Sequence, residues 1–240
     1  MKEYLLEKLK TLNLKEKNDL FVRYFEFNRY NHENNFTPFE INKHLFRIPP
    51  FELVQVFIDS GIDINAKNEA GYTLLFFAKS PKVAELLIQA GADVNTKNKY
   101  GTTPLFSAKS KEITELLIQA GADVNAQNNY RNTPLFFAKS KEIAEILIQA
   151  GADVNTRDKN GNTPLHWCNN QEIMELLIQA GADINIKNKN KETPSEYHRK
   201  NGHSDLADFM EQKAIEFERK KLNQVLPQSQ KNSNYSKYRL

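Results

Sequence analysis

Apolar and polar positions recur along the central part of the chain with a fixed period of 30 residues. Within residues 141–149, the polar side chains fall on one side of a helix and the apolar ones on the other. The polar side consists of Lys141, Glu142, Glu145 and Gln149. This segment is predicted to be an amphipathic helix with its polar side in solvent. Because one such unit cannot bury its apolar side alone, neighbouring units are expected to stack around a shared core.

Glycine marks the end of this helix in every unit. The recurring glycines are Gly61, Gly91, Gly121, Gly151 and Gly181. Glycine adopts the left-handed backbone conformation in which many helices end, without the steric cost that a Cβ brings. We therefore predict that each of these glycines ends a helix.

Polar residues mark two helix starts in each unit. The first start is a threonine followed by proline, at Thr103, Thr133, Thr163 and Thr193. The second start is a small polar residue, at Ser80, Ser110, Ser140 and Asn170. Such residues accept hydrogen bonds from the first N–H groups of a helix, and proline fits the first helical position. The turn-rich segments between units, such as 155–162, are expected to form an extended hairpin or loop.

The sequence TPLF-x-AK followed by ELLIQAGADVN resembles the ankyrin repeat, whose signature contains TPLH-x-A and GADVN. The resemblance implies an all-α repeat solenoid, an ankyrin-like stack of helix, helix and hairpin. Ankyrin repeats are usually about 33 residues long, and the residues missing here fall between the two helices. The first helix and the loop after it are therefore expected to be short. The full spacing returns after Thr193, which Gly202 and His203 follow as they do in the family.

The chain is predicted to consist of four segments, of which the resemblance covers the second. Residues 1–36 form an N-terminal helical cap, 37–210 the ankyrin-like repeat domain, 211–226 a C-terminal helical extension and 227–240 a flexible tail. A cap would cover the exposed face of the first repeat. A separate binding site in the N-terminal segment is the alternative.

Composition narrows the class of protein. Hydrophobic residues at 40% and charged residues at 26% are typical of a globular chain, and the net charge of +3 gives weak support to a nucleic-acid binder. The single cysteine, Cys168, permits no intrachain disulfide, which favours a reducing compartment and hence the cytoplasm. The sequence contains neither an export signal nor an apolar run of about 18 residues that could span a membrane.

No residue pattern predicts catalysis. His166 and Cys168 are two apart, so on a helix they would point in different directions, and His166 occupies the signature histidine position of the family. Trp167 stands where other units have phenylalanine and is interpreted as a packing residue. The aspartates of the GAD sequences are expected to form local hydrogen bonds, because a stack of repeats would spread them too widely for a metal site. We expect no catalytic residue, metal or cofactor.

The resemblance implies a non-catalytic module that binds another protein through its hairpin tips and inner helix face. Tyrosine is enriched in interface hot spots, which directs attention to the tips. The predicted partner-binding residues there are Tyr72, Lys99, Tyr100, Thr102, Asn129, Tyr130, Arg131, Asn132, Lys159 and Asn160. Solvated loops without a binding role are the alternative.

Lys79, Lys109 and Lys139 recur near the end of the first helix and are also candidate partner-binding residues. They either line the inner face as a ladder that attracts an acidic partner or interact with the helix C-terminus, and both interpretations stay open. We expect a monomer whose partner is a protein, with no nucleic acid and no membrane. An immunity protein that neutralises a toxin and a microbial effector are alternatives that act by the same binding. Nucleic-acid binding or an enzymatic activity in the terminal segments is the rival class.

Overall fold

The computed structural model describes residues 7, 9, 11–13, 15–17 and 50–225, and in the last range it describes the side chains of residues 51–220. Two compact units divide the chain, Met1–Asn129 and Tyr130–Leu240. Most of the predicted N-terminal cap, the start of the repeat domain at 37–49 and the predicted tail lie outside the described residues. In the first unit, Leu9 is buried and the Lys17 ammonium donates a hydrogen bond to the Ser60 carbonyl at 3.1 Å. The cap therefore stays a prediction.

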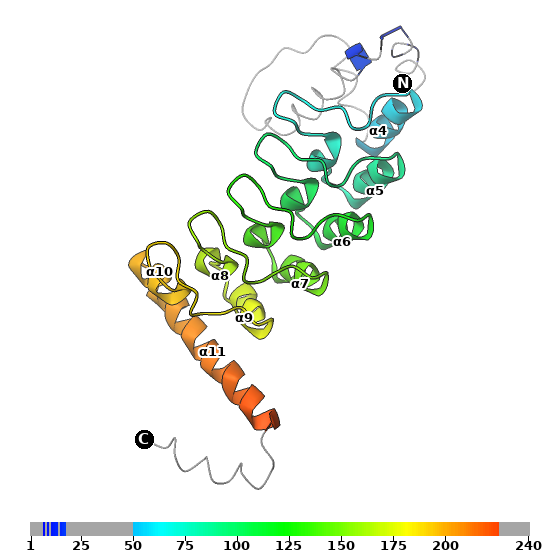
Figure 1. The fold of residues 1–240 in the computed structure, drawn as a ribbon. Helices are drawn as coiled ribbons and strands as arrows, with labels where there is room; N and C mark the ends of the chain where they lie inside the picture. The colour runs from blue at the N-terminus through cyan, green and yellow to red at the C-terminus, as the bar shows by residue number, and fades with distance from the viewer. Residues whose placement is uncertain (1–6, 8, 10, 14, 18–49, 226–240) are drawn as a thin grey trace, which may run out of the picture. The chain divides into compact units, whose positions relative to one another are not determined.

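The first unit repeats one pattern of short helix, longer helix and hairpin. Its elements are α4 (Pro50–Asp59), η1 (Leu74–Phe77), α5 (Pro81–Gln89), η2 (Pro104–Ser107) and α6 (Lys111–Gln119). In this unit the hairpins lie on one side of the short helices and the longer helices on the other (Figure 1). The short helices are single 3₁₀ turns, so the predicted shortening of the first helix is confirmed.

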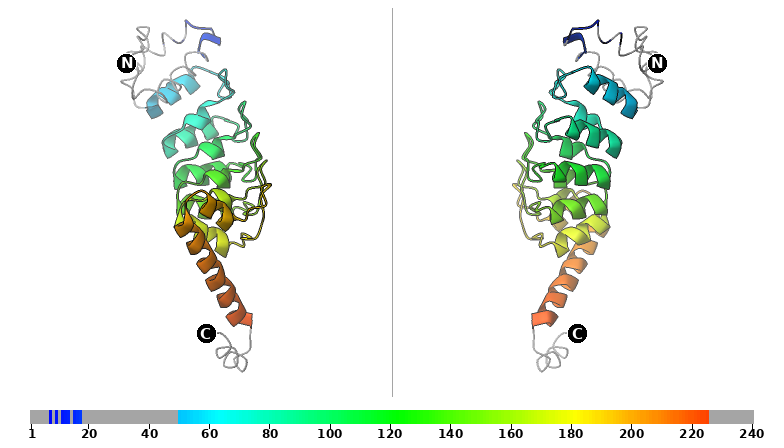
Figure 2. Two further views of the ribbon diagram at one scale, coloured as in Figure 1. Left: turned by 90° about the vertical axis from the view of Figure 1, so that its left-hand side faces the viewer. Right: turned by 90° about the vertical axis from the view of Figure 1, so that its right-hand side faces the viewer.

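The second unit has the same layers and a longer C-terminal end. Its elements are η3 (Pro134–Phe137), α7 (Lys141–Gln149), α8 (Pro164–Trp167), α9 (Gln171–Gln179), α10 (Pro194–Lys200) and α11 (Ser204–Val225). Helix α11 packs on α9 and α10 and then projects beyond them (Figure 2). Every regular element among the described residues is helical, which confirms the all-α repeat architecture.

The apolar side of each longer helix is buried as predicted. Equivalent leucines of α5, α6, α7 and α9 are at most 2% exposed; they are Leu87, Leu117, Leu147 and Leu177. Burial of one such side chain contributes roughly 1.5–3 kcal/mol of transfer free energy. The repeated leucine therefore supplies each unit with a core that no single repeat could form.

The predicted starts of the longer helices are confirmed. The Ser110 hydroxyl accepts a hydrogen bond from the Ile113 N–H at 3.3 Å, and Ser80 and Ser140 act in the same way. The Asn170 side chain accepts from the N–H groups of residues 172 and 173. At the other end, Gly121 has φ +88°, which confirms the left-handed helix end.

The threonine caps are only partly as predicted. Thr193 accepts from the Glu196 N–H and forms a capping box with it. Thr103 and Thr133 stand at the N-cap position but make no side-chain capping bond, so that prediction was wrong for them. Their hydroxyls, like that of Thr73, are buried and have no hydrogen-bond partner among the described residues.

Histidine explains why Thr163 differs from the threonines before it. The His166 Nδ1 lies 3.0 Å from both the Thr163 N–H nitrogen and its hydroxyl, and Nε2 lies 3.2 Å from the Glu192 carbonyl oxygen. Phe106 and Phe136, at the equivalent position, offer no such acceptor. The hydroxyl at position 163 is therefore satisfied, whereas those at 103 and 133 are not.

Asparagine side chains join successive repeats within a unit. The Asn95 amide donates to the Gly121 carbonyl at 2.9 Å, and its oxygen accepts from the Asp123 N–H at 2.8 Å. Asn65 and Asn155 make the same pair of bonds to the next repeat. Each asparagine thus fixes where the following helix ends.

Substitution of two left-handed glycines should separate backbone strain from steric clash. At Gly121 a Cβ would meet nothing within 4 Å, so Gly121→Ala should lower the free energy of unfolding by about 1 kcal/mol through conformation alone. At Gly101 (φ +75°) a Cβ would lie 2.6 Å from the Asn129 Oδ1 and 2.9 Å from its nitrogen, so Gly101→Ala should cost roughly 1–3 kcal/mol more. Denaturant midpoints that show equal losses would contradict this ordering.

A matched pair of threonine variants tests the role of His166. Thr103→Val removes a buried hydroxyl that has no partner and should raise the free energy of unfolding by about 1 kcal/mol. Thr163→Val removes a hydrogen bond to His166 and should lower it by about 1 kcal/mol. Urea denaturation measures both, and a change of the same sign in the two variants is the result that this explanation cannot accommodate.

The stability of the chain should fall in mild acid. Burial lowers the pKa of His166 and of His198 below the ordinary value of about 6.5. The unfolded chain then binds more protons than the folded chain in that range, so this stability is complete above about pH 7 and declines as pH falls through the folded pKa values. His166→Phe, which installs the residue of the earlier repeats, should reduce the slope between about pH 5 and 7. An unchanged slope in chemical denaturation would argue against it.

Candidate protein-binding surface

The hairpin tips are tight turns held by one side chain. The Asn98 Oδ1 accepts hydrogen bonds from the N–H groups of Tyr100 at 2.9 Å and Thr102 at 3.0 Å. Equivalent residues Asn68, Asp158 and Asn188 hold their turns in the same way. Because the first side chain of each turn accepts these two hydrogen bonds, it holds the backbone of the tip in one conformation.

Backbone hydrogen bonds link neighbouring tips inside each unit. In the first unit the Lys99 N–H donates to the Ala70 carbonyl at 3.0 Å, and the Asn129 N–H donates to the Tyr100 carbonyl at 2.9 Å. In the second unit the Lys159 N–H donates to Tyr130 at 2.9 Å, and Lys189 donates to Asn160 at 2.8 Å. The tips therefore form a preorganised edge rather than independent loops.

The three predicted tyrosines fall into two classes. Tyr100, in the first unit, is 55% exposed, and Tyr130, in the second, is 63% exposed. Tyr72 is half-buried, with its ring 5.0 Å from that of Phe76 and 5.6 Å from that of Phe77. It lies two positions later in the repeat than the other two, which explains the difference. Tyr100 and Tyr130 are thus the exposed tip aromatics.

The other predicted residues are placed as follows. Exposed side chains are those of Lys79, Lys99, Lys109, Asn129, Arg131, Lys139, Lys159 and Asn160. Thr102 and Asn132 are half-buried. The Asn129 amide donates to the Lys99 carbonyl at 2.9 Å, so this residue also has a structural role. The three lysines of the ladder lie two residues beyond the short helices, and the two interpretations of them stay open.

Two exposed aromatics of the second unit were not predicted to be part of a site. Trp167 is 53% exposed and Phe137 is 45% exposed. They occupy equivalent positions at the end of their short helices, and the interpretation of Trp167 as a packing residue was wrong. The Trp167 indole N–H donates to the buried Asp158 carboxylate at 3.3 Å, which orients the ring. Each of these short helices, the 3₁₀ turn η3 and the α-helix α8, is only four residues long, and its last residue lies at the surface.

Basic residues occupy a strained backbone position at two tips of the second unit. Arg131 and Lys191 have φ +64° and +63°, where Gly71, Gly101 and Gly161 stand in the other repeats. A side chain in this conformation costs roughly 1 kcal/mol or more. Such strain is often kept where a side chain serves a function.

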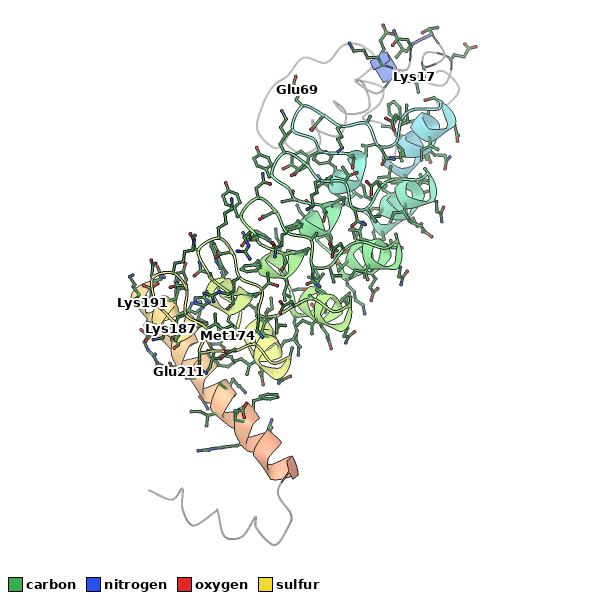
Figure 3. All side chains as sticks on the ribbon, in the orientation of Figure 1. Lys17, Glu69, Met174, Lys187, Lys191 and Glu211 are labelled. Atoms are coloured by element: carbon green, nitrogen blue, oxygen red, sulfur yellow. The ribbon has the colours of Figure 1, made fainter. Side chains whose placement is uncertain are left out.

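Charge is sorted between two faces of the second unit. The exposed charged residues of its hairpins are Arg131, Arg157, Lys159, Lys187, Lys189 and Lys191. Of the hairpin acids, Asp158 is buried and Glu192 is paired with Lys200. Figure 3 labels Lys187 and Lys191 in the last hairpin of this unit. The charged residues of α7 and α9 are Lys141, Glu142, Glu145, Glu172 and Glu175, so the hairpin edge is basic and the helical side acidic.

The chemistry of the remaining polar groups is structural. Burial raises the pKa of the Cys168 thiol, which donates to the Asn170 carbonyl, and this opposes the thiolate that a nucleophile needs. The repeated aspartates hold local turns as predicted, with the Asp93 Oδ1 accepting from the Asn95 N–H at 2.8 Å. Within the described residues, no three His, Cys, Asp or Glu side chains gather as metal ligands would. None of the described helices has the length and apolar character needed to cross a bilayer.

Comparison with known proteins agrees with this geometry. The family model for ankyrin repeats (3 copies) matches residues 49–128 and 108–188, which together exceed half of the chain. No curated protein matches the sequence. Ankyrin repeats are generally protein–protein interaction modules. The matched repeats, the left-handed helix ends and the hairpin turns lead to one conclusion: the chain belongs to the ankyrin repeat family.

Proposed function

We propose that this protein is a non-catalytic binding module that binds a partner protein through the hairpin edges of its two units. The observation that supports the proposal is the exposure of Tyr100 and Tyr130 on tips whose backbone is already fixed by hydrogen bonds. A tyrosine exposes a large apolar ring with a polar end, and it has few torsions to immobilise on binding. A rigid edge also avoids the entropy cost of ordering a loop.

The finer points of the proposal follow from charge and thiol chemistry. The basic hairpin residues Lys99, Arg131 and Lys159 favour a partner with an acidic surface, because opposite charges accelerate encounter and fix register. A monomer with one free cysteine suits a reducing compartment such as the cytoplasm. The same contact would allow the chain to act as an immunity protein that neutralises a toxin, or as an effector that binds an enzyme. Neither role requires a catalytic group in the chain.

Removal of the tip rings should weaken binding without unfolding the protein. Tyr100→Ala combined with Tyr130→Ala should cost a partner captured from the native host roughly 2 kcal/mol or more, if the rings are buried anchors. Stability should change by no more than about 0.5 kcal/mol, because exposed side chains contribute little to folding. Isothermal titration calorimetry and thermal denaturation measure the two effects.

The control lies on the longer helices. Glu115 lies on α6 and Glu145 on α7, and in each unit the longer helices lie on the opposite side of the short helices from the hairpins (Figure 1). Glu115 is only weakly paired with Lys111 at 3.7 Å. Replacement of both by alanine should leave the affinity within about 0.5 kcal/mol of wild type. Equal or greater weakening by the glutamate variants would move the interface to the outer helices and overturn the proposal.

A further inference from the structure

We propose that the second unit binds an acidic, proline-rich segment of its partner in the polyproline II conformation, along the surface formed by Trp167, Phe137 and the hairpin lysines Lys159 and Lys189. The inference rests on the proposed function and names the chemistry of the partner. The second unit exposes two pairs of side chains, the aromatic Phe137 and Trp167 and the basic Lys159 and Lys189. The members of each pair stand at the same position of successive repeats.

The basic set lacks internal partners. The ammonium groups of Lys159 and Lys189 are exposed, and no acidic side chain of the described chain forms an ion pair with either. Asp158, the residue before Lys159, is buried, and its carboxylate accepts hydrogen bonds from the Asn160 N–H and the Trp167 indole N–H. Positive charge at this edge is therefore available to an anionic ligand.

The aromatic set is preoriented. Trp167 is 53% exposed although its indole N–H is held by Asp158, so the hydrogen bond orients a ring that is still half accessible to a ligand. Phe137 is 45% exposed at the equivalent position one repeat earlier. Exposed aromatic surfaces of this kind accept proline-rich segments, because the rigid polyproline II helix loses little entropy on docking.

The repeat spacing selects the conformation of the ligand. Helices packed side by side lie about 8–10 Å apart, which sets the distance between equivalent residues of adjacent repeats. A polyproline II helix advances about 9.3 Å in three residues and returns its side chains to the same face. In a β-strand, side chains on one face are about 6.6 Å apart at every second residue and about 13 Å apart at every fourth. Neither distance matches the spacing of the repeats. Carboxylates three residues apart can thus face Lys159 and Lys189 together.

Strain at a neighbouring tip supports a ligand with negative charge. Lys191 keeps a left-handed backbone, φ +63°, where Gly161 stands in the preceding repeat. Glycine would relieve that conformation, so folding alone does not favour lysine there. An anionic partner would favour the lysine side chain at this position.

Synthetic peptides and the full-length chain test the inference. One peptide carries glutamate at every third position with proline and alanine between, and a permuted peptide of the same composition places its glutamates side by side. The periodic peptide should bind at least tenfold more tightly in calorimetry and should shift the emission of Trp167, the single tryptophan of the chain. Equal affinities for the two peptides, or no binding by either, would overturn the inference.

Matched variants locate the site. Lys159→Glu with Lys189→Glu should reduce the affinity for the periodic peptide at least tenfold, whereas Lys141→Glu on α7 should not. Lys191→Gly removes a cation while it relaxes the backbone, so a loss of affinity there cannot arise from unfolding. An unchanged affinity in both the double variant and Lys191→Gly would contradict the site.

Two further outcomes are distinguishable. An oligothymidylate that binds more tightly than the periodic peptide and competes with it would assign the surface to single-stranded nucleic acid and overturn the inference. If the peptide fails while Tyr100→Ala and Tyr130→Ala still weaken the captured partner, the proposed function stands and only the chemistry assigned to the partner is wrong.

Discussion

The hydrogen bonds that each repeat passes to the next are the interaction on which the rest of each unit depends. An asparagine such as Asn95 binds the carbonyl of Gly121 and the N–H of Asp123, so the end of one helix is fixed by the preceding repeat. The left-handed glycine permits this geometry, in which the Gly121 carbonyl and the Asp123 N–H both bond to the asparagine side chain. Within each unit, backbone hydrogen bonds between neighbouring hairpin tips join successive repeats a second time.

This constraint turns the hairpin edge into a surface that can vary in sequence. Because the turn start and the backbone are already bonded, exposed tip positions such as 100, 130 and 160 can carry tyrosine or asparagine. The strained Arg131 and Lys191 show how far this freedom extends, since even glycine is replaced there by a basic residue. Recognition is thus concentrated on positions whose change leaves the fold intact.

The period of the sequence was enough to predict most of the fold, because each feature is local. Ser110 and Gly121 act through residues a few positions away, so their roles follow from spacing alone. The failures involve contacts that spacing does not reveal. Thr103 lacks a partner because Phe106 replaces histidine, and Trp167 is exposed because it is the last residue of the four-residue helix α8. The hydrogen bonds of Asn95 to the next repeat were not predicted from the sequence, although an asparagine recurs at this position in every repeat.

For the candidate site, the sequence grouped Tyr72 with Tyr100 and Tyr130, whereas an alignment of the repeats by position would have shown that Tyr72 stands two positions later. The binding role of all three tyrosines stays a prediction. Hydrogen–deuterium exchange of the protein with and without its captured partner is the most direct test of the hairpin edge as the binding surface. The account predicts that the partner slows exchange at hairpin residues 99–102, 129–132 and 159–162 and leaves α6 and α7 unchanged. Protection confined to Lys111–Gln119 and Lys141–Gln149 would contradict it.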